Sequence, residues 1–269
     1  MNTAITLSSN LAAMTLYIAA SGYLITQLRH RENINQPWLL AFAVCGLAFH
    51  AIGIEGIIFS PEGFQFGFFK VSSLIFWVIN ALVLLSSLKK PLQILFILLF
   101  PLSSLAVLVS IFTQGPVLPY SHMSEGLAGH ILLSILAYSL LTIATVQALF
   151  LAFQNHQLKH KNPTGMVQLL PPLQTMESLL FETLWLGQLL LTAAIATGFF
   201  FLHDLFAQHL VHKTVFSLSA WSIYAILLWG RSQLGWRGNT AIRWTLVGFV
   251  ALMLAYFGSK LVLEVLLSH

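Results

Sequence analysis

Long runs of apolar residues alternate along the chain with short polar or Gly- and Pro-rich stretches. A helix needs about 20 apolar residues to cross the hydrocarbon core of a bilayer, whereas a membrane barrel shows short segments of alternating polarity. The pattern therefore predicts an all-α protein, a polytopic transmembrane helical bundle of about eight spans that forms a single integral-membrane domain over residues 1–269. The predicted spans are Ile5 to Leu28, Trp38 to Phe59, Phe69 to Leu88, Pro91 to Phe112, Leu127 to Phe153, Glu182 to Leu202, Thr214 to Trp229 and Ile242 to Leu263.

Three connecting stretches have a composition of their own. The stretch from Ser60 to Phe68 is rich in Gly and Phe, and the stretch from Thr113 to Gly126 is rich in Gly and Pro, so we expect loops at both. The extended polar stretch from Gln154 to Gln174 leads into an amphipathic segment, Leu173 to Phe181, that we expect to feed the sixth span.

Composition strengthens the membrane prediction. Apolar residues make up 58% of the chain and charged residues only 7%, against about a quarter charged in an ordinary soluble domain. So few charges exclude a soluble enzyme, a disordered chain and a nucleic-acid-binding module. The lipid bilayer is therefore the expected environment, and no nucleic acid is expected as a partner.

The net charge of +4 reflects basic residues that are unevenly divided between the two sides of the predicted bundle. Loops after the first, third, fifth and seventh spans hold nine of the twelve, whereas Lys70, Lys213 and Lys260 lie on the other side. The nine are Arg29, Arg31, Lys89, Lys90, Lys159, Lys161, Arg231, Arg237 and Arg243. Because cytoplasmic loops carry the excess of Lys and Arg, both termini are predicted to lie outside. We expect a multi-pass protein of the bacterial inner (cytoplasmic) membrane.

The histidines also divide by side. His50 lies within the second predicted span, in its outer half, and six more of the ten histidines fall on the outer side. These six are His122, His130, His203, His209, His212 and His269. An ionisable residue inside a span is costly and indicates function. Imidazole is a ligand for haem iron, zinc or copper, and haem suits a site at the membrane edge because its apolar disc carries two carboxylates. The alternative for His50 is a buried histidine bonded to a neighbouring helix, and the alternative for His130 is an ordinary residue at the start of the fifth span.

A second cluster on the predicted outer side favours a different function. His203, His209 and His212, together with Asp204, combine imidazole and carboxylate ligands, a mixture that suits a divalent transition metal. The chain has a single cysteine, Cys45, so no Cys-based zinc site is possible. This cluster points to a metal-homeostasis accessory protein or transporter, and a non-catalytic membrane scaffold is the third hypothesis. No Ser-His-acid order and no H-E-x-x-H motif is present, so we expect no catalytic activity of its own.

Two further motifs have a structural interpretation. Gly235-Trp236-Arg237-Gly238 reads as a compact turn between spans, with Arg237 at the lipid headgroups. The run from Leu170 to Glu177 reads as a proline stop followed by a helix start with an acidic residue in its first turn. Neither motif identifies a function by itself.

Several segments, taken in order, resemble the cytochrome c assembly family of haem-handling membrane proteins, of the CcsA/CcmC type. They cover most of the chain, and the branch they resemble is that of YpjD-like inner membrane proteins. The segments are Ala48 to Gly53, Leu127 to His130 with Leu136 to Tyr138, Leu170 to Glu177, Ala220-Trp221 with Tyr224-Ala225, Gly235 to Gly238, and Ala255 to Gly258.

The resemblance implies a protein that holds haem b at the outer side of the membrane, with His50 and His130 at the family's histidine positions. It also implies membrane partner proteins of cytochrome assembly, whereas the metal hypothesis implies partners in ion homeostasis. Trp229 and Leu267 stand where the family has its other two histidines, and the loop from His203 to Lys213 lacks the family's tryptophans. The family's double bis-histidine arrangement therefore cannot be copied here. Either haem binds with different ligands, for which His212 and His209 are the candidates, or this branch does something else with the same fold.

Overall fold

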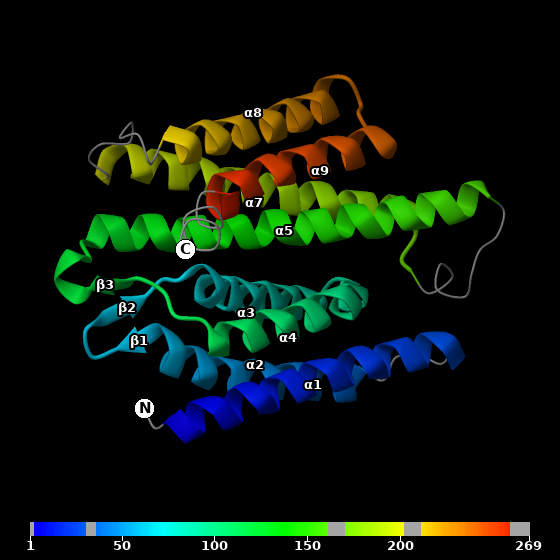
Figure 1. The fold of residues 1–269 in the computed structure, drawn as a ribbon. Helices are drawn as coiled ribbons and strands as arrows, with labels where there is room; N and C mark the ends of the chain where they lie inside the picture. The colour runs from blue at the N-terminus through cyan, green and yellow to red at the C-terminus, as the bar shows by residue number, and fades with distance from the viewer. Residues whose placement is uncertain (1–2, 31–35, 161–169, 202–210, 259–269) are drawn as a thin grey trace. The chain divides into compact units, whose positions relative to one another are not determined.

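The computed structural model describes residues 3–30, 36–160, 170–201 and 211–258, and these are mostly helical (Figure 1). Short 3-10 turns, η1 (Gln93–Leu95) and η2 (Tyr120–His122), and a π-helical turn, η3 (Leu254–Gly258), adjoin the α-helices. The α-helices of the described residues are α1 (Thr3–His30), α2 (Gln36–Ile58), α3 (Phe68–Ser87), α4 (Phe96–Phe112), α5 (Glu125–Lys159), α7 (Leu173–Phe201), α8 (Val211–Gln233) and α9 (Asn239–Met253).

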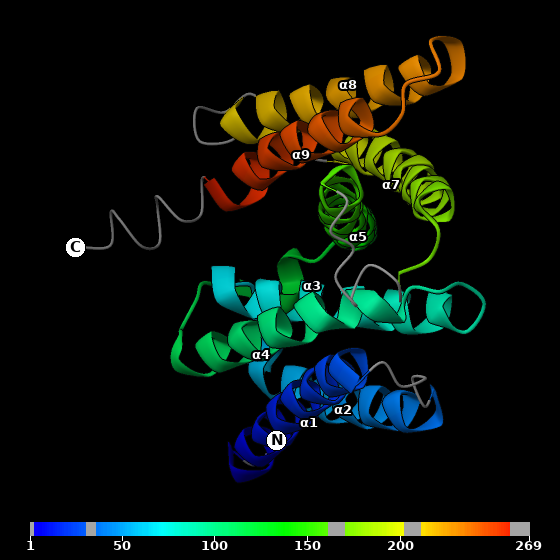
Figure 2. The same cartoon turned by 90° about the vertical axis from the view of Figure 1, so that its right-hand side faces the viewer.

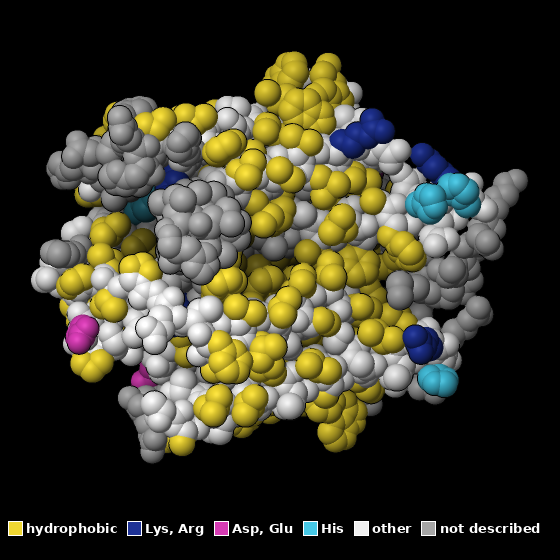
Figure 3. Space-filling view, viewed as in Figure 1, with side chains coloured by type: hydrophobic (Ala, Val, Ile, Leu, Met, Phe, Trp, Pro, Cys, Tyr) yellow, Lys and Arg dark blue, Asp and Glu magenta, His cyan; other side chains and the backbone are white. Residues whose placement is uncertain are grey.

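The helices confirm the all-α polytopic membrane class. Within the described ranges, seven helices are long and apolar enough to cross a bilayer, and α8 is not among them. Hydrophobic side chains are spread over the visible face with few charged side chains among them, as expected of a surface that lipid solvates (Figure 3). The eighth span and the outside location of both termini stay predictions.

Two of the predicted loops contain strands. β1 (Phe59–Ser60), β2 (Gly63–Gln65) and β3 (Val117–Pro119) form an antiparallel sheet in the order β1-β2-β3. Gly63 permits this pairing because its φ of 153° is rare for other residues, and a Cβ there would overlap the Leu118 carbonyl. The strands are two or three residues long, too short for an alternating pattern to reveal them.

The helix bounds also differ from the prediction at α7. The amphipathic lead-in and the sixth predicted span form one continuous helix of 29 residues, Leu173–Phe201. Pro171 and Pro172 precede this helix and do not interrupt it.

The described chain divides into two compact units. Unit 1 comprises Met1–Met123 and Pro163–Leu170, and unit 2 comprises Ser124–Asn162 and Pro171–His269. Unit 1 therefore holds α1 to α4 and the sheet, and unit 2 holds α5, α7, α8 and α9. The prediction of a single domain stays a prediction.

Unit 1 is built around aromatic side chains at the contact of α1 with α2 and α4. The fully buried ring of Tyr17 stacks on Phe100 with 4.9 Å between ring centroids, and Phe100 stacks on Phe96 at 4.3 Å. Gly46 of α2 lies against the Tyr17 ring so closely that a Cβ there would come within 2.9 Å of it. Close approach of this kind is how helices associate in lipid, where no hydrophobic effect drives them together.

Unit 2 also brings its helices into close contact through glycines. Helix α5 packs against α7 and α9, and α8 runs beside α9 in both ribbon views (Figures 1 and 2). Gly187 of α7 lies against Leu141 of α5, and Gly248 of α9 lies against the buried ring of Tyr224. A hydrogen bond of 2.8 Å from Trp221 Nε1 to Thr192 Oγ1 links α8 to α7.

We expect Gly46→Leu to destabilise the protein by about 1–3 kcal/mol, because the added side chain would overlap the Tyr17 ring. That ring is stacked on Phe100 and has no space to move aside. The matched control is Gly22→Leu on α1, where a Cβ would meet no atom within 4 Å. The free energy of unfolding in mixed detergent micelles measures the effect. Equal stability of the two variants would contradict the packing role assigned to Gly46.

Candidate functional site

His50 is completely buried in unit 1, and both of its ring nitrogens have partners. Tyr17 Oη of α1 lies 3.1 Å from His50 Nδ1, and Ser73 Oγ of α3 lies 2.9 Å from His50 Nε2. One imidazole on α2 therefore bridges three helices. This geometry is the one expected of the alternative, a buried histidine bonded to neighbouring helices.

The two partners allow one tautomer that suits a metal ligand. With Nδ1 protonated, the ring donates to Tyr17 Oη, and Nε2 carries the lone pair and accepts a hydrogen bond from Ser73. Histidines that bind metals have one nitrogen held by such a second partner. The group in front of Nε2 is a serine hydroxyl, which turns about a single bond, so the donor set at His50 fits a haem iron.

Other polar side chains of unit 1 are paired across helices in the same way. Asn80 Nδ2 of α3 donates to Ser103 Oγ of α4 at 2.7 Å, and Trp77 Nε1 donates to the Leu47 carbonyl at 3.0 Å. Buried polar groups in lipid must find partners inside the protein. The interior around His50 is thus a set of specific interhelical bonds.

His130 lies near the start of α5 in unit 2 and is half-buried. Its Nδ1 lies 2.9 Å from the Ala194 carbonyl of α7, and because a carbonyl only accepts, Nδ1 carries the hydrogen. The lone pair is then on Nε2, for which the described part of the chain provides no hydrogen-bond partner. A backbone carbonyl behind Nδ1 and a lone pair on Nε2 form the arrangement typical of a metal-binding histidine.

For the remaining predicted ligands the structure describes at most the backbone. His212 lies in the first turn of α8, and His203 and His209, with Asp204, fall outside the described residues. Across residues 3–30, 36–160, 170–201 and 211–258, no group of three or more His, Cys, Asp or Glu side chains is arranged to hold a metal ion. Trp229, at a family histidine position, lies on α8 and is 57% exposed.

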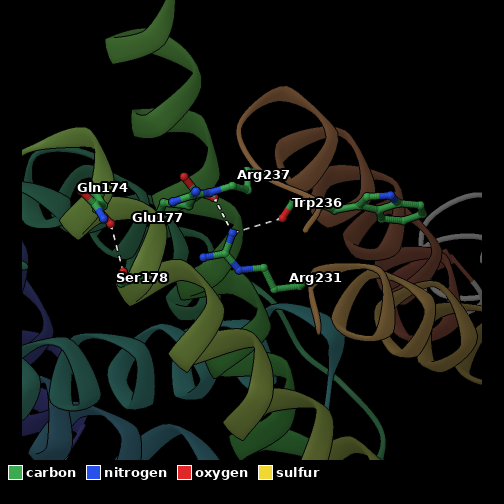
Figure 4. A network of polar contacts seen from close by, with 6 residues as sticks. All are labelled: Gln174, Glu177, Ser178, Arg231, Trp236 and Arg237. Atoms are coloured by element: carbon green, nitrogen blue, oxygen red, sulfur yellow. Dashed lines mark hydrogen bonds and ion pairs between the residues drawn. The ribbon is translucent and has the colours of Figure 1, made fainter. Parts of the chain in front are cut away.

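The structure joins two motifs that the sequence analysis kept apart. Glu177, from the segment after the prolines, accepts a hydrogen bond from Arg231 Nη1 at 3.1 Å, and Arg237 Nε lies 3.5 Å from the same oxygen, Oε1 (Figure 4). Arg231 also donates to the Trp236 carbonyl at 3.3 Å and lies over the Phe181 ring. The carboxylate side chain is only 6% exposed, so this Glu177 cluster is a partly buried ion pair between α7 and the α8–α9 turn.

Local backbone requirements explain why the α8–α9 turn takes this shape. Gly230 lies against the indole of Trp236, where a side chain would overlap the ring, and Gly235 has a φ of 67°. Trp236 in turn lies beside Trp244 with 5.2 Å between ring centroids. The signal in the sequence was an acidic residue without a nearby partner and two arginines in a tight turn, but their separation in the chain hid the pairing.

We expect Glu177→Gln to destabilise the protein by about 1–3 kcal/mol, because it replaces a charged acceptor by a neutral amide and leaves two guanidinium groups without their counter-charge. Unfolding in mixed micelles measures the loss. Arg243→Gln, at an exposed position of α9, is the control and should change stability little. A Glu177→Gln protein as stable as wild type would show that the ion pair contributes nothing.

Comparison with known proteins points to one family. The family model described as "Cytochrome C assembly protein" matches residues 38–267. The inner membrane protein YpjD of Escherichia coli strain K12 is 30% identical over 258 residues, which are 95% of this chain and 98% of that protein. An uncharacterised 28.8 kDa protein of Azospirillum brasilense is 36% identical over 141 residues, which are 52% of each chain. No solved structure matches significantly. The chain therefore belongs to the cytochrome c assembly protein family.

Proposed function

We propose that this protein handles haem b at the outer side of the bacterial inner membrane, with His50 of unit 1 and His130 of unit 2 as the proposed iron ligands. Membership of the cytochrome c assembly family supports a haem-handling role, and the name of the Escherichia coli relative supports the inner membrane location. When bound, haem supplies an iron whose axial positions accept imidazole nitrogens.

The observation that carries the proposal is the geometry of His130. Its Nδ1 is held by the Ala194 carbonyl, which fixes both the ring orientation and the tautomer. Nε2 is left with a lone pair, and no hydrogen-bond partner for it lies within the described ranges. A half-buried imidazole prepared in this way is ready for a ligand bond without first breaking another bond.

His50 supports the proposal by a different route. Burying a polar ring in the middle of a membrane helix has a cost that an apolar residue would avoid. Tyr17 and Ser73 offset that cost and hold the ring at a defined orientation between α1 and α3. His212 remains the proposed substitute ligand in place of the family's missing histidines.

The proposed role is to hold haem and present it to another protein. Catalytic turnover is not part of it, because the sequence contains neither a Ser-His-acid order nor an H-E-x-x-H motif. A partner supplies the acceptor, and proteins of cytochrome assembly are the proposed partners.

We expect protein purified in mild detergent from haem-replete cells to show a Soret band that shifts on reduction with dithionite. His50→Ala and His130→Ala should each weaken or shift this band, because each removes a proposed iron ligand. His156→Ala, on the polar end of α5, is the matched control and should leave the spectrum unchanged.

A featureless spectrum from folded, monodisperse wild-type protein would contradict the proposal. A band that neither His50→Ala nor His130→Ala alters would keep haem binding and reject these two ligands.

A further inference from the structure

Lys70 is a buried cation on α3, the helix whose Ser73 contacts His50. It is the third residue of α3, only 8% of its surface is exposed, and its ammonium donates to Gln65 Oε1 of β2. No carboxylate lies within ion-pair distance of Lys70 among the described residues, where Glu55 and Glu62 are both exposed. A buried ammonium with one neutral amide partner lacks a counter-charge, and leaving it so is costly.

The position of Lys70 relative to His50 follows from α3. Ser73, which contacts His50 Nε2, comes three residues after Lys70 on the same helix. Residues three apart lie on one helix face with their Cβ atoms about 5–6 Å from each other. The Lys70 side chain therefore starts from the face of α3 that meets His50, one turn nearer the predicted outer end of the helix, and its ammonium reaches Gln65.

The small sheet holds the partner of Lys70 in place. Gln65 pairs with Val117 in the β2–β3 ladder, and the next residue, Phe66, donates its N–H to the Pro116 carbonyl at 3.2 Å. The rings of Phe64 and Phe66 stack on each other, and alternation along a strand directs them away from the Gln65 side. Gln65 is thus a fixed acceptor, and it takes only one of the three N–H donors of the ammonium.

We propose that Lys70 binds a carboxylate of the ligand held at His50, which for haem is a propionate. The inference rests on the proposed function and names the charged end of the same ligand. A haem at His50 needs an apolar surround for its disc and a cation for its carboxylates, and unit 1 places a buried cation one helical turn along α3 from Ser73, which contacts the imidazole. The ligand then provides the counter-charge that Lys70 lacks.

The test compares haem with its dimethyl ester, in which both carboxylates are neutral. Each is titrated into haem-free full-length protein in the same detergent and followed by absorption. The variants are Lys70→Met, Lys70→Arg and, as the matched control, Lys89→Met at an exposed position just after the end of α3. Comparing the ratio of the two affinities between variants cancels any difference in how haem and ester partition into detergent.

We expect wild type and Lys89→Met to bind haem at least about tenfold more tightly than the ester, the ratio typical of one charge-assisted contact. The ratio should fall to near one in Lys70→Met and be largely kept in Lys70→Arg. Gln65→Glu offers a second check that keeps Lys70 itself, because a carboxylate built beside the ammonium competes with the ligand and should also lower the ratio.

The outcomes separate the two proposals. Wild type that binds neither compound overturns the proposed function, and this inference with it. Wild type that binds both equally, or a Lys70→Met protein that keeps the wild-type ratio, overturns the role of Lys70 and leaves haem binding intact.

Discussion

The structure depends on one constraint: a polar group inside a lipid-embedded bundle must be hydrogen-bonded within the protein. Unit 1 meets this constraint at His50 with bonds to two other helices, through Tyr17 and Ser73, whereas Asn10 Oδ1 and Asn80 Oδ1 are buried without a partner among the described residues. Lipid provides no hydrophobic drive for helices to associate, so such bonds and close glycine contacts hold the bundle together. The residue that is the strongest ligand candidate in unit 1 is therefore also a tie between three helices.

Most of the fold could be predicted because bilayer thickness sets the length of each apolar run. The fold prediction was wrong for elements whose length the bilayer does not determine. The three strands are too short to show a period, and their pairing depends on Gly63 and on residues from a distant loop. The continuity of α7 was not predicted, because the polar residues of the segment from Leu173 to Phe181 indicated an element separate from the sixth span. In the structure this segment is part of one helix, and its Glu177 is buried.

The candidate site was predictable in part for a similar reason. His50 and His130 are conspicuous in the sequence because imidazole is costly in an apolar run. Their partners were not predictable, because Tyr17, Ser73 and the Ala194 carbonyl come from other helices. Lys70 was counted only as one of the basic residues, and its burial depends on the sheet that the sequence did not reveal. The pairing of Glu177 with Arg231 could not be predicted either, because the two residues are 54 positions apart in the chain.

The Ser73 hydroxyl has a consequence for how long a ligand would stay. On the proposed function, an iron that takes His50 Nε2 must displace the serine that already occupies this nitrogen. Loss of a hydrogen bond worth about 1 kcal/mol weakens ligand binding roughly fivefold, and the bond forms again when the ligand departs. Ser73 would act as a tethered competitor that is always present at the site. Such a competitor suits a carrier, which must release its cargo, better than an enzyme that retains a permanent prosthetic group.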